Sequence, residues 1–209
     1  LDVDPGESVI GLLPGSRREE VERLLPPMLV AAKRLSAAGV ARRFALGLAP
    51  TVDAAAVGRL VKAAVDEGGP RVDVFERRTY EVMAAADVVL ISSGTATLEA
   101  ALLGAPMVVC YRVSRVTEAV VRLLVKVRWC SLPNLIANRG VVPEVLQDEL
   151  TGQRLAAEAL RLIEDPAAAG AQRAAFERVR AQLGAPGVGR RAAQAVIETA
   201  RLGVPVPRA

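Results

Sequence analysis

Histidine is absent from the 209-residue chain, and cysteine occurs only twice. Without histidine, the chain by itself cannot supply a Ser-His-Asp triad, a histidine-based metal site or a histidine general base. The two cysteines, Cys110 and Cys130, lie far apart and belong to no metal-binding or redox motif. Their scarcity and spacing predict reduced thiols within a core rather than a disulfide or a reactive thiol.

Aromatic residues make up only 3% of the sequence, so alanine, valine and leucine must form most of the core. Hydrophobic residues of all kinds reach 52%, which is enough to bury a core and excludes an intrinsically disordered chain. The formal net charge of +4 suits an anionic small molecule or an anionic membrane surface. The charge is too weak, and aromatic residues are too few, to indicate binding of nucleic acid.

Long apolar runs are missing as well. The longest apolar stretches contain Asp87, Glu99 or Pro106, so none of them predicts a helix that spans a membrane. The chain begins at Leu1 rather than at a methionine, directly before a strand pattern, and we therefore expect it to be part of a longer protein.

Short apolar runs alternate with helical patterns along the first half of the chain. The apolar runs predict strands at 8–13, 43–49, 71–76, 87–92 and 106–112, and the helical patterns lie at 17–35, 52–67, 79–86 and 95–104. Continuously apolar strands that alternate with helices are typical of a parallel sheet covered on both faces. The sequence therefore predicts a Rossmann-like α/β fold with a helical carboxyl-terminal segment from about residue 151. Within the first helix, Pro26 and Pro27 predict a kink or a restart.

A cluster of small polar residues, Ser92 to Thr95, stands at the end of the strand predicted at 87–92, where open α/β sheets bind ligands. Gly94 allows close approach of the backbone, Thr95 can cap the next helix, and the free N–H groups of that helix favour phosphate. One turn further on, the carboxylate of Glu99 can accept hydrogen bonds from the two adjacent hydroxyls of a ribose. The alternative is a structural capping box that joins Thr95 to an acid in the first turn.

The strand predicted at 8–13 ends in a similar way. Gly15 can turn the chain, Ser16 can cap the next helix, and Arg17 carries a planar guanidinium suited to phosphate. An ordinary strand–helix turn with a solvated arginine is the alternative. Two such strand ends in one sheet indicate a nucleoside diphosphate bound across the carboxyl edge, although neither GxxxxGK[ST] nor GxGxxG is present.

A third candidate is the segment 131–150, which Pro133 and Pro143 bracket and which we expect to be non-helical. It contains Asn134, Asn138 and Arg139. Because an asparagine amide both donates and accepts hydrogen bonds, Asn134 is able to read the edge of a base such as uracil. A structural loop with Asx-turns is the alternative.

Residues 116–129 are both basic and apolar, with Arg122, Lys126 and Arg128 placed among valines and leucines before Trp129. Such a segment can contact an anionic membrane surface or a lipid substrate. It can equally be a core helix whose basic side chains reach solvent, and the sequence leaves both interpretations open.

Four stretches, in this order and spacing, resemble the lipid-A-disaccharide synthase family. They are "LLPGSRREEVERLLP" (12–26), "ADVVLISSGTATLEAALLGAPMVVCYRVS" (86–114), "LVKVRWCSLPNLIANRGVVPEVLQDELT" (124–151) and "RRAAQAVIE" (190–198). The resemblance covers nearly all of this chain but only the carboxyl-terminal half of the family's enzymes, and it implies one half of a two-domain GT-B fold. On this basis we expect a UDP-sugar donor-binding domain at 1–184. Residues 185–209 would form a helix and arm that pack on the absent amino-terminal half or on a partner subunit.

The function that the resemblance implies is a glycosyltransferase of lipid A biosynthesis. It transfers 2,3-diacylglucosamine from UDP-2,3-diacylglucosamine to 2,3-diacylglucosamine 1-phosphate, and it releases lipid A disaccharide 1-phosphate and UDP. The family acts in the cytoplasm, peripherally on the anionic inner face of the inner membrane, and the resemblance allows a homodimer. Another UDP-sugar enzyme of the same fold, such as a UDP-N-acetylglucosamine transferase or 2-epimerase, remains an alternative, as does a non-catalytic nucleotide-binding module.

The resemblance also implies roles for individual residues. Gly15, Ser16 and Arg17 would contact the pyrophosphate, Ser93, Gly94 and Thr95 would lie at the phosphates, Glu99 would bind the ribose, and Asn134 would lie near the nucleotide. Neither a metal ion nor a cofactor is implied. The catalytic residues are expected in the amino-terminal half, so we expect this chain alone to bind nucleotide without turnover.

Overall fold

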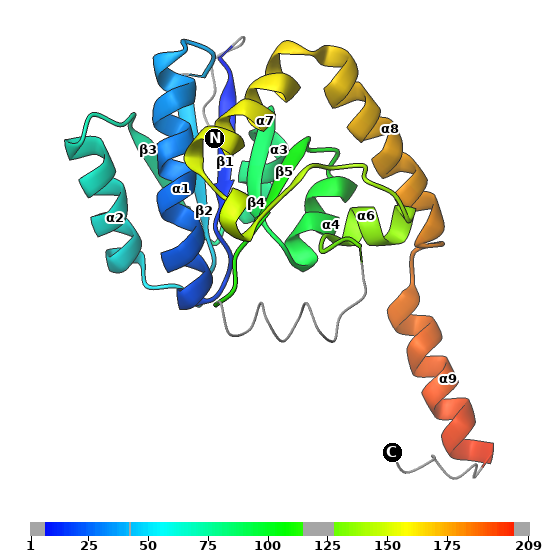
Figure 1. Cartoon of the computed structure of the whole chain (residues 1–209). Helices are drawn as coiled ribbons and strands as arrows, with labels where there is room; N and C mark the ends of the chain where they lie inside the picture. The colour runs from blue at the N-terminus through cyan, green and yellow to red at the C-terminus, as the bar shows by residue number, and fades with distance from the viewer. Residues whose placement is uncertain (1–6, 42, 115–127, 203–209) are drawn as a thin grey trace.

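The computed structural model describes residues 7–41, 43–114 and 128–202 (Figure 1). Its strands are β1 (Val9–Leu13), β2 (Arg43–Leu48), β3 (Val72–Glu76), β4 (Val88–Ser92), β5 (Met107–Tyr111) and β6 (Glu144–Leu146). Its α-helices are α1 (Arg18–Ala37), α2 (Ala54–Asp66), α3 (Thr79–Ala85), α4 (Thr95–Leu102), α6 (Leu132–Ala137), α7 (Gly152–Glu164), α8 (Pro166–Gln182) and α9 (Val188–Leu202), with a short 3-10 helix at Gln147–Glu149. Most of the basic segment 116–129 lies outside the described residues.

The six strands form one sheet in the order β3-β2-β1-β4-β5-β6, and each neighbouring pair is parallel. In the centre of the sheet, Leu12 of β1 lies opposite Leu46 of β2 on one side and Leu90 of β4 on the other. The expected parallel sheet and Rossmann-like α/β class are confirmed. The strand order reverses between β1 and β4, which makes this pair the topological switch point of the sheet.

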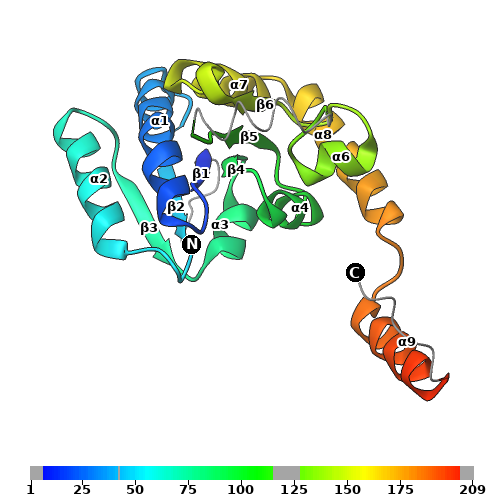
Figure 2. The same cartoon turned by 60° about the horizontal axis from the view of Figure 1, so that its bottom comes forward.

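Helices cover both faces of the sheet (Figure 2). On one face, Ile10 and Leu12 of β1 pack in a cluster with buried residues of α1, α2 and α7. On the other face, Val9 and Leu13 pack in a second cluster with residues of α3, α4 and α8. Successive strand residues point to opposite faces, so a strand buried on both sides is apolar throughout. This arrangement explains the unbroken apolar runs that predicted the strands.

The segment 131–150 is not the non-helical stretch that the prolines predicted. Pro133 lies in the first turn of α6, where a missing backbone N–H removes no helical hydrogen bond. Pro143 directly precedes β6, and its carbonyl oxygen accepts a hydrogen bond from the N–H of Val109 at 2.9 Å. The prolines therefore mark the start of a helix and the start of a strand.

The restart predicted at Pro26 and Pro27 is also wrong, because α1 runs as one helix from Arg18 to Ala37. Each proline removes a backbone hydrogen bond within the helix. Buried apolar residues on either side of the pair, including Leu24, Leu25 and Met28, hold the helix against the sheet. Tertiary packing thus outweighs the local preference for a break.

The short edge strand β6 pairs only with Val109–Tyr111, so the start of β5 has a neighbouring strand, β4, on one side only. The side-chain amide of Gln172, on α8, takes the place of a strand on the other side. Its Oε1 atom accepts from the N–H of Met107 at 2.9 Å, and its Nε2 atom donates to the carbonyl oxygen of Met107 at 3.1 Å. This buried pair of hydrogen bonds fixes α8 to the edge of the sheet.

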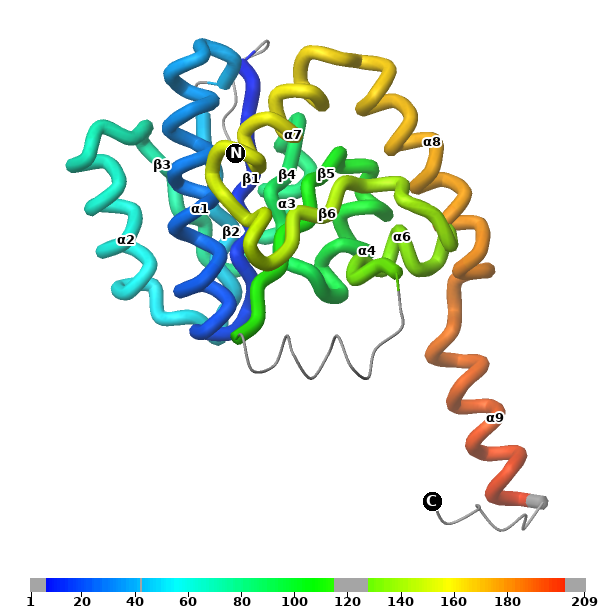
Figure 3. The backbone as a smooth tube through the Cα atoms, in the orientation of Figure 1, coloured from blue at the N-terminus to red at the C-terminus, as the bar shows by residue number. Residues whose placement is uncertain are grey.

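The last described helix, α9, projects away from the sheet and its covering helices (Figures 1 and 3). Residues 181–201 are exposed throughout, and Val188, Val196 and Ile197 are 71, 68 and 45% exposed. None of the helices in the described ranges is both long enough and apolar enough to cross a bilayer.

Candidate functional site

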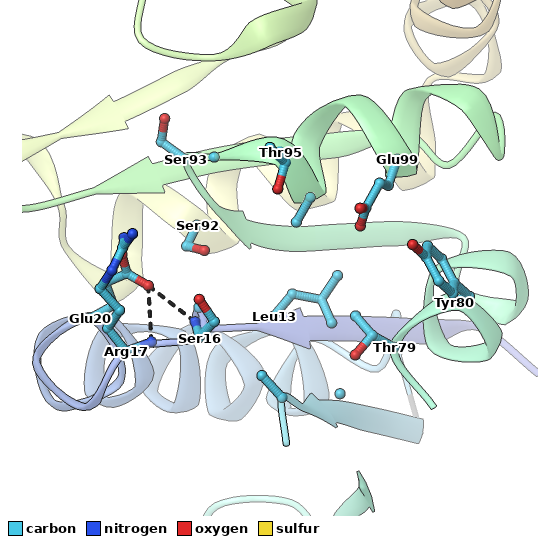
Figure 4. A pocket seen from close by; sticks show the side chains of 15 residues that line it. Leu13, Ser16, Arg17, Glu20, Thr79, Tyr80, Ser92, Ser93, Thr95 and Glu99 are labelled. Atoms are coloured by element: carbon cyan, nitrogen blue, oxygen red, sulfur yellow. Dashed lines mark hydrogen bonds and ion pairs between the residues drawn. The ribbon is translucent and has the colours of Figure 1, made fainter. Parts of the chain in front are cut away.

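A pocket of about 500 Å³ opens where the carboxyl ends of β1 and β4 meet (Figure 4). This is the switch point, at which open α/β sheets bind their ligands. Seven of the eight site residues predicted from the sequence line the pocket, namely Gly15, Ser16, Arg17, Ser93, Gly94, Thr95 and Glu99. The fold therefore brings together two clusters that stand about eighty residues apart in the chain.

The turn from β1 into α1 forms one wall of the pocket. Gly15 adopts a φ of +114°, a backbone conformation that favours glycine. The carboxylate of Glu20 accepts hydrogen bonds from the backbone N–H groups of Ser16 at 3.0 Å and Arg17 at 3.2 Å. Glu20 also pairs with Nη1 of Arg17 at 2.7 Å. The start of α1 is therefore already occupied by a negative charge that belongs to the chain.

The turn from β4 into α4 forms the opposite wall and is built differently. Gly94 is the N-cap of α4, with a φ of +155°, and no described side chain caps this helix. A hydrogen bond fixes the Ser93 side chain, because its Oγ donates to the carbonyl oxygen of Cys130 at 2.8 Å. Thr97 Oγ1 donates to the carbonyl oxygen of Gly94 at 2.7 Å and thereby fixes the turn. The N–H groups at the start of α4 are thus free of a side-chain cap, and the helix dipole favours an anion there.

Glu99 is not part of a capping box at this helix. Because Gly94 is the N-cap, the capping position for an acid would be residue 97, and Glu99 lies two positions beyond it. Half of such a capping box is found instead at α1, where the carboxylate of Glu20 accepts from the backbone N–H of the N-cap residue Arg17. Glu99 is left to line the pocket with its carboxylate.

Tyr80 approaches Glu99 from α3 (Figure 4). The charge of the Glu99 carboxylate, and the hydrogen bond that this carboxylate accepts from the phenol, raise the pKa of Tyr80 above its ordinary value. Tyr80 is 57% exposed and presents its ring at the mouth of the pocket. Tyr80, Thr79 and Glu20 were not among the site residues predicted from the sequence, although Arg17 and Glu20 have the i, i+3 spacing at which opposite charges pair.

Asn134, the eighth predicted residue, does not line the pocket. Its side chain is fully buried, and its Oδ1 atom accepts from the N–H groups of Val141 and Val142 at 2.7 and 2.9 Å. Its Nδ2 atom donates to the carbonyl oxygen of Val142 at 2.9 Å and to Oε1 of Glu144 at 2.8 Å. All of its amide hydrogen-bonding capacity is used within the chain. The role is structural, as the alternative held, but Asn134 lies in α6 rather than in a loop with Asx-turns.

Glu144 gathers the hydrogen bonds of this neighbouring segment. Burial opposes its ionisation, but the hydroxyl of Ser131 and the backbone N–H groups of Cys130 and Ser131 donate to its carboxylate and lower its pKa. Burial and the charge of Glu144 raise the pKa of Cys130 to about 12. Burial likewise raises the pKa of Cys110, and both cysteines are free thiols.

The pocket combines one open helix N-terminus, one arginine and two carboxylates. Within the described ranges, no three or more acidic or cysteine side chains are grouped so as to hold a metal ion. An anion can bind at the start of α4, and Glu99 can bind hydroxyl groups next to it. This set of groups fits a phosphorylated sugar or a nucleotide.

Comparison with known proteins shows the family of this chain. The sequence profile of the family described as lipid-A-disaccharide synthetase matches residues 1–198. The chain belongs to this family. It is 45% identical over 201 residues to the lipid-A-disaccharide synthase of Anaeromyxobacter dehalogenans strain 2CP-1, a match that covers 96% of this chain and 52% of that protein. The chain thus spans about half the length of the curated relatives it matches.

Solved structures show the same fold at lower sequence identity. The calicheamicin glycosyltransferase CalG4 matches 96% of this chain and 44% of its own with a TM-score of 0.58 and 16% identity. The UDP-GlcNAc 2-epimerase of Neisseria meningitidis, in a structure bound to UDP-GlcNAc, matches 87% of this chain and 46% of its own with a TM-score of 0.55 and 18% identity. The expected GT-B half-domain is confirmed as a fold.

Proposed function

We propose that the pocket holds the UDP portion of UDP-2,3-diacylglucosamine in a glycosyltransferase of lipid A biosynthesis. The whole protein would transfer 2,3-diacylglucosamine to 2,3-diacylglucosamine 1-phosphate, so that lipid A disaccharide 1-phosphate and UDP are released. Family membership over residues 1–198 supports this reaction. The single observation that carries the role of this domain is the pocket at the switch point, where an uncapped helix start and Glu99 face the same cavity.

In this proposal the diphosphate lies at the start of α4, against Ser93, Gly94 and Thr95. The free N–H groups and the dipole of α4 stabilise its charge, and Arg17 reaches it from the opposite wall. Negative charge builds up on the diphosphate as the glycosidic bond to it breaks. Helix dipoles and arginine then take the part that a metal ion plays in other sugar transferases.

The ribose lies beside Glu99 in the same proposal. Its two hydroxyls donate to the carboxylate, which the phenol of Tyr80 holds in place from α3. The exposed ring of Tyr80 at the mouth of the pocket leaves the uracil next to an aromatic surface, where stacking is favourable. The Neisseria epimerase, whose solved structure has the same fold and contains UDP-GlcNAc, supports this proposal.

The acceptor site and the catalytic acid or base are proposed to come from the half of the family's length that this chain does not match. The exposed apolar residues of α9 suit a surface that packs on that half or on a partner subunit in a homodimer. The division into a donor-binding domain at 1–184 and an arm at 185–209 rests on this packing. Because both substrates are acylated, we place the reaction at the cytoplasmic face of the inner membrane, where the mild basicity of the chain favours anionic lipid.

Calorimetric titration of the 209-residue chain with UDP tests the proposal for this domain, with ADP and uridine as matched ligands. We expect saturable binding of UDP, weaker binding of ADP because the base differs, and weaker binding of uridine because the diphosphate is missing. Circular dichroism verifies that the chain is folded. Absence of UDP binding by the folded chain, or equal affinity for UDP and uridine, would overturn the proposed site.

A further inference from the structure

Two helices start at the walls of the pocket, and a carboxylate of the chain itself binds at the turn before one of them, α1. The N-terminus of α4 has no side-chain cap among the described residues. At α1, the carboxylate of Glu20 accepts from the N–H groups of Ser16 and Arg17 and pairs with the Arg17 guanidinium. These donors lie at the N-cap and one residue before it, next to the free N–H groups of the first turn of α1, and a phosphate group bound there would also contact them. Glu20 thus occupies the position of an anion.

The turn is closely fitted around this carboxylate. The Glu20 side chain is only 16% exposed, whereas those of its neighbours Glu19 and Glu22 are 75 and 53% exposed. A Cβ atom at Gly15 would collide with Oε2 of Glu20, so the absence of a side chain at Gly15 makes room for the carboxylate. Thr51 braces the same turn, since its Oγ1 donates to the carbonyl oxygen of Ser16 at 2.6 Å.

On the basis of the function proposed above, we propose that Glu20 is a specificity-determining residue that competes with the ligand diphosphate. A phosphate group can use the N–H groups of Ser16 and Arg17, and Nη1 of Arg17, only by displacing the Glu20 carboxylate. A small free anion binds the β1–α1 turn too weakly to displace the Glu20 carboxylate. A nucleoside diphosphate that is also held through its sugar at Glu99 can do so, and the pocket therefore selects for ligands that bind both walls.

The test compares Glu20→Gln with Glu19→Gln in the full 209-residue chain. The amide oxygen introduced by Glu20→Gln can still accept both backbone hydrogen bonds, which share one oxygen of Glu20, so the turn is retained while the charge is lost. Glu19→Gln changes the net charge equally on a side chain that pairs with Arg23 and does not line the pocket. The probes are inorganic pyrophosphate and UDP, titrated by calorimetry at low and at high ionic strength, with circular dichroism and thermal melting as readouts of folding.

We expect Glu20→Gln to tighten binding of pyrophosphate by about three- to tenfold at low ionic strength, because a like charge is removed from the anion position. This increase in affinity becomes smaller at high ionic strength, because salt screens the charges. We expect Glu20→Gln to increase the affinity for UDP as well. The competition between Glu20 and the diphosphate would be refuted if a folded Glu20→Gln chain bound neither probe more tightly. It would also be refuted if Glu19→Gln increased the affinity by the same factor. If Glu20→Gln binds pyrophosphate more tightly but UDP binds neither this variant nor the parent chain, Glu20 does compete with an anion and the proposed nucleotide function is wrong.

A double-mutant cycle adds a readout that a purely structural cap would not move. In the parent chain Glu20 neutralises Arg17, so we expect Arg17→Ala to lower the affinity for pyrophosphate only slightly. In the Glu20→Gln background the guanidinium is free, and we expect Arg17→Ala to weaken binding by a larger factor than in the parent chain. An equal or smaller factor would contradict the displacement of Glu20 by the ligand.

Discussion

The Nδ2 atom of Asn134 donates a hydrogen bond to Oε1 of Glu144 at 2.8 Å, and this contact ties α6 to the start of β6. The same amide holds the backbone of Val141 and Val142 in between. Asn134, which was predicted to lie near the nucleotide, thus holds together the segment beside the pocket through its hydrogen bonds. Through Cys130, whose carbonyl oxygen accepts from Ser93, that segment reaches the turn at the start of α4.

Replacement of Asn134 by alanine is expected to destabilise the chain by about 2–4 kcal/mol, because buried donors and acceptors lose their partners. Thermal unfolding followed by circular dichroism measures the change, which corresponds to a fall of roughly 4–16 °C in the midpoint for a domain of this size. Gln182→Ala, at an exposed amide in α8, is the control. An unchanged midpoint together with a large loss of UDP affinity would instead make Asn134 a direct nucleotide contact.

Glu144 makes the stability of this segment depend on pH. Hydrogen bonds hold its pKa below the ordinary value of 4.5 in the folded chain despite its burial. An unfolded chain therefore takes up the proton first as pH falls, and the stabilisation is present above about pH 4.5 and lost as pH drops through the folded pKa. We expect Glu144→Gln to be less stable than the parent chain at pH 7 by about 1–2 kcal/mol.

Urea unfolding of both chains between pH 3 and pH 7 measures that difference. The two free energies of unfolding are expected to converge toward the acid end. A difference that stays constant over the whole range would mean that the ionised form of Glu144 adds nothing to stability. Glu149→Gln, in the nearby 3-10 helix and exposed, provides the matched charge change.

The two strand ends at the pocket could be predicted because a βα turn is local. The residues that end a buried strand and begin a helix are adjacent in the chain, so Ser93 and Gly94, like Gly15 and Arg17, were visible together. The expectation that both turns share one edge followed from the parallel sheet alone. That β1 pairs directly with β4, and so places both turns on one pocket, is a property of the strand order.

The roles of Asn134, Glu20 and Tyr80 could not be predicted in the same way. The partners of Asn134 are backbone groups whose positions depend on how β6 joins the edge of the sheet. Arg17 looked free for phosphate because its i, i+3 spacing to Glu20 allows an ion pair without requiring one, and the bonds from Ser16 and Arg17 to Glu20 depend on the folded turn. Tyr80 lies in the first turn of α3, and only the assembled sheet brings it to Glu99.

The contact of Tyr80 with Glu99 can be measured without any ligand. The chain contains two tyrosines, so Tyr111→Phe leaves Tyr80 as the single one, and its ionisation can be followed by ultraviolet absorbance. We expect the titration midpoint to lie above the ordinary value of 10.0, because the carboxylate of Glu99 opposes the phenolate and accepts the bond from the phenol. Adding Glu99→Gln is expected to lower the midpoint, whereas Glu81→Gln, elsewhere on α3, leaves it in place. If Glu99→Gln left the titration midpoint of Tyr80 unchanged, the two side chains would not interact in solution.

Glu99→Gln also separates the two parts of the proposed nucleotide. If the carboxylate binds the ribose hydroxyls, the substitution weakens UDP by about 1–3 kcal/mol, the range for hydrogen bonds to a charged group and for a partner left unsatisfied. It leaves 2′,3′-dideoxy-UDP, which has no such hydroxyls, almost unchanged. Glu81→Gln is again the control, because Glu81 pairs with Arg78 and does not line the pocket. Equal losses for both ligands would mean that Glu99 acts on the diphosphate or on the start of α4, and the ribose would then have to lie elsewhere in the pocket.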